Sequence, residues 1–182
     1  MSFTDLIPAE VFAAQRQFMR IMDSQRDFAW WAETLVTKET AELKKAHDEK
    51  EGIEQILKEM GDVIYVVAGF YNCMPAAPVE LLSDERNQKI DEIITDAWNT
   101  LVTISNDHMI SPEIIGEAFA AVHLSNLSKL DPETGEPIRR EDGKILKGPF
   151  YQPADMTKVV KQWKAFIETQ NQGPTEDAEN SD

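Results

Sequence analysis

The segment formed by residues 53–72 constrains the fold of this chain more than any other. Its apolar residues recur with the spacing of an α-helix. In its second half, VIYVVAGFY, apolar side chains cover nearly every side of that helix. A helix that is apolar all round has to be surrounded by other elements. We therefore expect it to be the central helix of a bundle.

The remaining pattern is also helical, and we expect an all-α fold. Ser83 and Ser111 are predicted N-caps, and Pro112 suits a first helical position. Turn signals dominate 130–153, where EDGK indicates a small hairpin, so the helical bundle would carry an irregular loop there and a C-terminal helix after it. The other predicted helices span residues 9–23, 28–50, 85–105, 112–129 and 154–169.

Composition bounds the organisation and the partners of the chain. With 182 residues, we expect one domain over 1–170 and a disordered acidic tail over 171–182. The net charge of −15 argues against nucleic-acid binding. No apolar run is long enough for a membrane span, and the start lacks a secretory signal, so we expect a cytoplasmic protein. Cys73 is the single cysteine, which excludes an internal disulfide.

Two acidic pairs border the predicted interior. Glu39 and Glu42 lie one turn apart in the second predicted helix, with Glu39 placed in its apolar row. Glu59 and Asp62 lie on the flank of the central helix. A short turn at Gly52 makes the two helices antiparallel neighbours. The sequence therefore predicts that the two pairs face each other.

Four converging carboxylates repel one another unless a cation lies between them. Mg²⁺ and Mn²⁺ prefer such oxygen ligands. The alternative is a decorated surface, because 33 of the 182 residues are acidic, but two pairs on adjacent helices favour the metal. A di-iron site is excluded because the residues three positions before the histidines are Lys44, Ser105 and Ala120 rather than Glu. The chain also has no Gly-rich phosphate loop.

The motifs ETAE (39–42), EMGD (59–62) and the following VIYVV resemble the signature of the MazG-like, all-α nucleoside triphosphate pyrophosphohydrolases. The similarity covers residues 28–72. The segment VHLSNLSKLDPETGEPIRREDGKILKGPFYQPAD resembles a block of a phage-associated, MazZ-like branch of that family. Lys38 is a departure, since many members carry Glu there.

The resemblance implies that a nucleoside triphosphate is cleaved to the monophosphate and pyrophosphate. Glu39, Glu42, Glu59 and Asp62 would bind two or more Mg²⁺ or Mn²⁺ ions, and one of these carboxylates would accept a proton from the attacking water. The sequence leaves open which one. The phage-type block favours a purine substrate such as dGTP, with dUTP or dCTP as alternatives, in the host cytoplasm if the chain is phage-encoded.

Basic, polar and aromatic residues complete the predicted substrate site. Each has an alternative role: a helix C-terminus favours Lys, the loop lysines have acidic neighbours, and tryptophan packs in cores. Asn126 and Lys129 are the candidates for contacts to the sugar and phosphates. Lys144 and Lys147 are the candidates for a lid over the triphosphate, and Trp30 and Gln15 are the candidates for contacts to the base.

A non-enzymatic helical scaffold with a degenerate site is the rival hypothesis. In either case we expect a homodimer or homotetramer. Two antiparallel helices do not bury a helix that is apolar all round, and the last predicted helix adds another apolar stripe.

Overall fold

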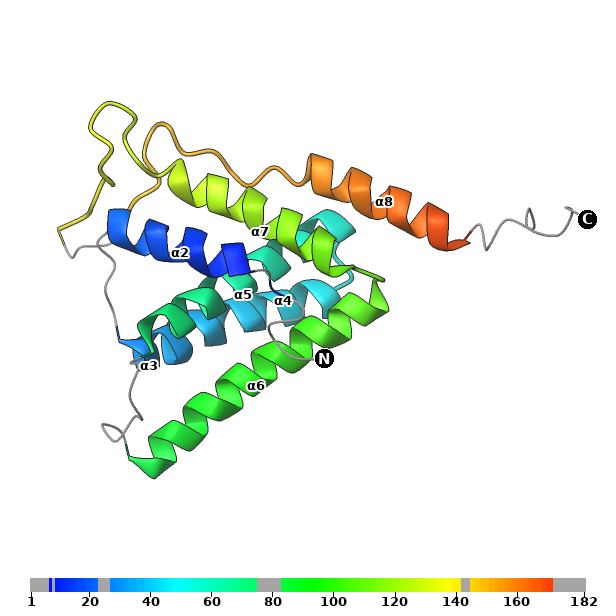
Figure 1. Cartoon of the computed structure of the whole chain (residues 1–182), viewed down its shortest axis with the longest axis horizontal. Coiled ribbons are helices and arrows are strands. Elements are labelled where there is room, and N and C mark those ends of the chain that lie inside the picture. Colours follow the sequence, from blue (N-terminus) through cyan, green and yellow to red (C-terminus); the bar gives the residue numbers. More distant parts are fainter. Residues whose placement is uncertain (1–6, 8, 23–26, 75–82, 142–144, 172–182) are drawn as a thin grey trace, which may run out of the picture.

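The structure is a computed structural model that describes residues 7, 9–22, 27–74, 83–141 and 145–171. It is an all-α protein, as predicted, and its described residues form no β-strand beyond two isolated bridges. None of the described helices is long and apolar enough to cross a membrane. Figure 1 shows α2 (Ala9–Ile21), α3 (Phe28–Trp30), the π-helix η1 (Trp31–Val36), α4 (Thr37–Asp48), α5 (Ile53–Cys73), α6 (Asp84–Asp107), α7 (Pro112–Leu127) and α8 (Thr157–Asn171).

Helix α5 is the centre of the bundle, which confirms the prediction from its sequence. Most of its residues between Ile56 and Phe70 are buried. The helix packs against α2, η1, α4, α7 and α8. Its burial is therefore achieved within one chain, and it does not by itself require a second copy.

The helix predicted over residues 28–50 is interrupted. The turns from Trp31 to Val36 are π-helical, with i→i+5 hydrogen bonds that give each turn one extra residue. This changes the phase of the helix before α4 begins. The predicted apolar row is wrong in consequence: Val36, Thr40 and Leu43 are buried, whereas Glu39 lies beside that row.

Two predicted helix starts are confirmed. The Ser83 side chain accepts a hydrogen bond from the Arg86 backbone N–H at 3.3 Å, and Ser111 accepts one from Ile114 at 3.5 Å. Pro112 occupies the start of α7, where its missing N–H is not needed. These local signals fix where α6 and α7 begin.

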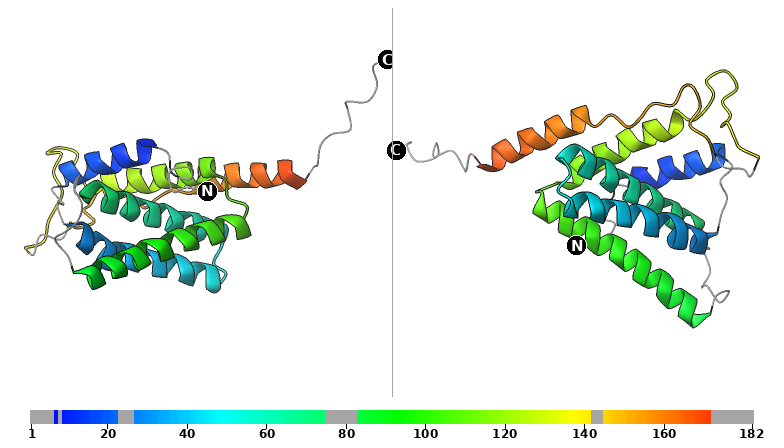
Figure 2. Two further views of the ribbon diagram at one scale, coloured as in Figure 1. Left: turned by 60° about the horizontal axis from the view of Figure 1, so that its bottom comes forward. Right: turned by 180° about the vertical axis from the view of Figure 1, so that it is seen from behind.

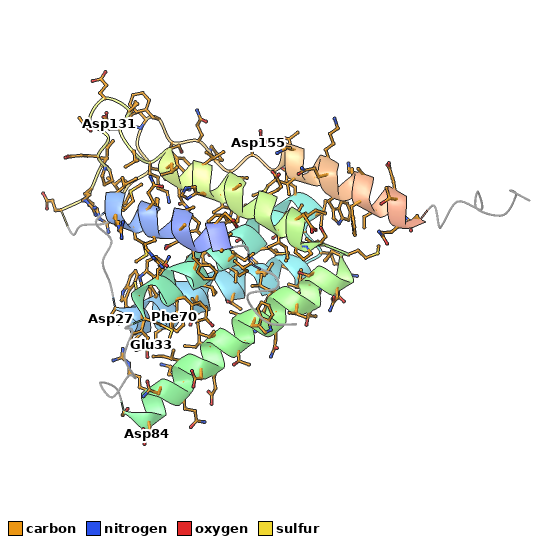
Figure 3. The ribbon with its side chains drawn as sticks, in the orientation of Figure 1. Asp27, Glu33, Phe70, Asp84, Asp131 and Asp155 are labelled. Carbon is orange, nitrogen blue, oxygen red and sulfur yellow. The ribbon has the colours of Figure 1, made fainter. Side chains whose placement is uncertain are left out.

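Helix α6 lies across α4 and η1. Arg86 pairs with Glu33 at 2.9 Å, and Lys44 pairs with Asp96 at 2.7 Å. Figure 3 shows Glu33 near the N-cap Asp27, at the end of the bundle where α6 starts with Asp84. These exposed pairs tie the start of α6 to η1 and the middle of α6 to α4.

The predicted irregular excursion is present between α7 and α8. Isolated bridges join Leu130 to Pro137 and Arg139 to Ile145, while the tip at 142–144 lies outside the described residues. Helix α8 then runs along α7 and extends past its start (Figure 2). The tail for which we predict disorder lies, from residue 172, outside the described part of the chain.

Candidate functional site

Three of the four predicted carboxylates meet between α4 and α5. Oxygen atoms of Glu39, Glu42 and Glu59 all lie within 4.8 Å of one another. The first two share a face of α4 because they are three residues apart, and the antiparallel packing of α5 brings Glu59 opposite them. Among the described residues, they are the one group of at least three His, Cys, Asp or Glu side chains with this spacing. We call these three residues the acidic cluster.

Asp62 does not belong to the acidic cluster but is joined to it through a lysine. The Lys58 Nζ lies 2.8 Å from Glu59 Oε1 and 2.9 Å from Asp62 Oδ2. Burial opposes the charge of Lys58, but its hydrogen bonds and the charges of both acids raise its pKa. Asp62 is thus the outer neighbour of Glu59 on α5.

A second lysine contacts the other acidic pair, and the sequence reasoning missed both lysines as partners of the acids. The Lys38 Nζ lies 2.9 Å from Glu39 Oε1 and 2.8 Å from Glu42 Oε2. Burial lowers the pKa of Lys38, and the bonds to the two carboxylates raise it by more. A signal was present in the sequence, since each acidic pair directly follows a lysine, as KETAE and KEMGD.

Glu59 is a buried carboxylate with an incomplete set of partners. Its side chain is 6% exposed. The Oε1 atom accepts hydrogen bonds from Gln55 Nε2 at 2.5 Å and Lys58 Nζ at 2.8 Å, whereas Oε2 is buried without a hydrogen-bond partner. A buried oxygen of this kind needs an explanation. The neighbouring side chains of the acidic cluster, Glu39 and Glu42, also offer carboxylate oxygens. Three oxygen ligands of this kind fit a hard divalent cation such as Mg²⁺ or Mn²⁺.

Glu39 has an altered affinity for protons. Burial raises its pKa from an ordinary 4.5 to about 7; the Lys38 hydrogen bond opposes this shift, and the charge of Asp62 adds to it. The Glu42 carboxylate behaves differently, because its hydrogen bond with Lys38 lowers its pKa. Neighbouring acids of one cluster therefore hold their protons over different pH ranges.

A polar cavity of about 570 Å³ opens beside these acids. One wall comes from α4 and α5, and the other from the end of α7 and the segment leading into α8. Basic and acidic groups thus face each other across one space. The cavity is lined by Lys38, Glu39, Glu42, Glu54, Gln55, Lys58, Asp62, Val122, Ser125, Asn126, Lys129, Lys147, Tyr151, Pro153, Ala154 and Met156.

Three predicted substrate-binding residues lie in this cavity. Lys129 donates to Asn126 Oδ1 at 2.6 Å, and burial lowers the pKa of Lys129. The Nζ of Lys147 lies 4.5 Å from the centroid of the Tyr151 ring. The structure therefore brings Asn126, Lys129 and Lys147 to the side opposite the acidic pairs.

Two further cavity residues, Ser125 and Tyr151, were missed by the sequence reasoning. The buried Ser125 hydroxyl donates to the Gln152 carbonyl at 2.7 Å, and the Gln152 N–H donates to Ser128 Oγ at 2.8 Å. These bonds fasten the loop to the end of α7. The sequence signal was the GPFYQPAD stretch, whose aromatic and proline residues follow the lysines.

The remaining candidates are not brought to the cavity. Gln15 is buried in α2 and accepts a hydrogen bond from Asn72, at the far end of α5. Ten residues separate Asn72 from Asp62, or about 15 Å along the helix. Trp30 is half-buried against the Trp31 ring and does not line the cavity either. Lys144 lies outside the described residues.

Fold and site together define an all-α protein with a partly buried group of carboxylates at the wall of a polar cavity. Comparison with protein-family models, with curated proteins and with solved structures finds no match to this chain.

Proposed function

We propose that this protein is a metal-dependent nucleoside triphosphate pyrophosphohydrolase of the MazG-like type. The observation that carries the proposal is the buried Glu59 carboxylate, whose Oε2 has no hydrogen-bond partner. One of its oxygens lies within 4.8 Å of oxygens of Glu39 and Glu42, and these two residues line the polar cavity. Lysine side chains on the opposite wall suit a polyphosphate. An acidic surface alone offers no reason for a buried, unsatisfied carboxylate oxygen.

The chain's own residues have separable roles in this reaction. Bound Mg²⁺ or Mn²⁺ would neutralise phosphate charge and lower the pKa of the attacking water. Glu39, Glu42, Glu59 and Asp62 hold the ions. One of these carboxylates accepts the proton of that water. On the opposite wall, Asn126, Lys129 and Lys147 orient the phosphates and the sugar.

A nucleotide is the favoured substrate class on size and on sequence. A cavity of about 570 Å³ lies in the ordinary range for small-molecule sites. The resemblance of the 122–155 segment to the MazZ-like block favours dGTP. An enzyme for dUTP or dCTP is the alternative within the same chemistry.

A panel of all NTPs and dNTPs with Mg²⁺, with the products separated, tests the proposal. We expect one or a few nucleotides to give monophosphate and pyrophosphate, with dGTP among the best. Release of orthophosphate would overturn the assigned reaction. A lack of turnover, together with no nucleotide-induced rise in Tm in the presence of metal, would instead favour the scaffold.

Metal binding is expected to depend on pH through Glu39. The pKa of this group is 4.5 in its ordinary state and about 7 when folded and metal-free, so the folded protein holds a proton that the unfolded chain releases above pH 4.5. The free energy of unfolding therefore decreases from pH 4.5 to 7 because of this group, and the decrease is complete above pH 7. A divalent cation has to displace this proton. Mn²⁺ affinity should therefore rise about tenfold per pH unit up to about 7 and then level off.

Isothermal titration with Mn²⁺ between pH 5.5 and 8.5 measures this dependence. The Glu39→Gln variant is the matched control, because it lacks the titrating carboxyl and should give a flatter profile. Equal slopes for the two proteins would contradict the assignment of the proton to Glu39.

A homo-oligomer remains our proposal for the assembly. The apolar stripe predicted for the last helix lies on α8, where Trp163 and Phe166 are only partly buried, and Leu124 on α7 is 67% exposed. Light scattering during size-exclusion chromatography should give the mass of a dimer or tetramer. The mass of one 20.6 kDa chain would contradict the proposal.

A further inference from the structure

Lys38 and Lys58 are the structure's own cations for the acidic pairs, and both also line the cavity. Each lysine contacts the acid that follows it and the acid four positions on. The two helices thus carry the same local arrangement.

Helix stability does not account for this arrangement. An i,i+4 pair stabilises a helix more when the acid precedes the lysine, and here the lysine precedes the acid in both helices. Exposed pairs also contribute little, and the Lys38 side chain is 55% exposed. The contacts therefore point to the acids themselves, which have to be neutralised at a partly buried site.

The lysines neutralise the site incompletely. When the four carboxylates Glu39, Glu42, Glu59 and Asp62 are all ionised, the two ammonium groups balance only half of their charge. Both donors to Glu59 use Oε1, so its buried Oε2 stays without a partner. The site thus keeps a residual attraction for a divalent cation while it already holds two displaceable monovalent ones.

We propose that Lys38 and Lys58 are exchangeable cations: they occupy the carboxylates in the metal-free protein, and they move to the polyphosphate when divalent metal takes their place. The inference rests on the proposed function and assigns phosphate-binding roles to two residues that it did not use. The flexible four-carbon stem of lysine permits the movement without a change in the backbone. Lys58 is 36% exposed at its side chain, and both lysines border the same space as Lys129 and Lys147.

The exchange explains a charge problem in this cavity. A nucleoside triphosphate carries about four negative charges and has to approach a wall of carboxylates. Once divalent ions hold those carboxylates, the two released ammonium groups face the substrate from the acidic wall, while Lys129 and Lys147 face it from the other. The phosphates are then contacted by positive charge on both sides.

Mn²⁺ titration of the Lys58→Met and Lys38→Met variants, without nucleotide, is the first test. Each variant lacks a competitor for the carboxylates, so its Mn²⁺ affinity should rise about tenfold over the unaltered chain. Lys45→Met on α4 is the matched control, because Lys45 pairs with Glu49 at 3.9 Å on an exposed surface away from the cavity. It should leave the affinity unchanged.

The second test measures binding of inorganic pyrophosphate in the presence of Mg²⁺. Loss of a released ammonium should weaken pyrophosphate binding about tenfold in Lys58→Met and Lys38→Met, and not in Lys45→Met. Because Lys38 is largely exposed, its variant tests the proposal even if Lys58→Met does not fold.

The outcomes separate the two proposals. If the unaltered protein binds no Mn²⁺, the proposed function fails. If it binds Mn²⁺ but the variants bind it equally or more weakly, or bind pyrophosphate as well as before, the exchange is wrong while the proposed function stands. Tighter Mn²⁺ binding together with weaker pyrophosphate binding supports the exchange.

Discussion

Replacing Glu59 by Gln should lower kcat by about 10³-fold or more while the protein remains folded. The amide has the shape of the carboxylate and keeps an oxygen that can accept from Gln55 and Lys58. It lacks the charge that a divalent cation requires of a buried ligand.

Steady-state kinetics and Mn²⁺ titration measure this effect, and circular dichroism monitors the fold. Glu49→Gln is the matched control, since Glu49 caps α4, is exposed and does not line the cavity. Its kcat should stay within about twofold. If Glu59→Gln retained more than a tenth of the activity, Glu59 would not be a metal ligand, and the central observation behind the proposed function would lose its meaning.

Replacing Gly61 by Val should destabilise the protein by about 2–4 kcal/mol and lower its Tm by about 10 °C. A Cβ on Gly61 would lie 2.8 Å from Val122 Cγ2 and 2.9 Å from the carbonyl oxygen of Ala118. The backbone of α7 cannot yield as a flexible side chain can, so the two helices have to separate. This cost exceeds the gain of up to about 1 kcal/mol that removal of a mid-helix glycine brings.

The same substitution should also impair catalysis in the molecules that stay folded. Gly61 lies between Glu59 and Asp62, and the α7 residues that it contacts precede Asn126 and Lys129 by one to three turns. A displaced α7 moves both phosphate-binding candidates away from the acids. We expect KM to rise about tenfold.

Thermal melts and KM measurements check the Gly61→Val prediction. Gly52, the N-cap of α5, provides the control as Gly52→Ala, because no atom lies within 4 Å of a Cβ placed there. Its effect should stay below about 1 kcal/mol, as expected for an N-cap glycine. If Gly61→Val melted with the unaltered protein, α5 and α7 would not be in the close contact described here.

The elements of the fold were predictable where their signals are local. The central helix α5 was predicted from a periodicity that its own residues carry, and Ser83 and Ser111 mark helix starts with side chains that bond the backbone three residues on. The π-helix at Trp31–Val36 was not predicted, because a single extra residue per turn leaves no distinct pattern in the sequence.

The candidate site was predictable only where its geometry follows from spacing within one helix. The pairing of Glu39 with Glu42 follows from their spacing on one helix. Gln15 and Trp30 were placed with the base on residue type alone, and neither reaches the cavity. Lys38 was noted only as a departure from a family pattern, although it pairs with both Glu39 and Glu42.

The sequence by itself determined that this chain is helical, that α5 is its centre, and that two acidic pairs border the interior, because periodicity, caps and i,i+3 spacing act within a single helix. Only the tertiary structure decided which acids lie within 4.8 Å of one another, that lysines contact all of them, and that the end of α7 closes the cavity. Distances between side chains on different helices depend on the phase of each helix and on how closely the backbones approach. Here the π-helix at Trp31–Val36 sets the phase of α4, and Gly61 permits the close approach of α5 to α7.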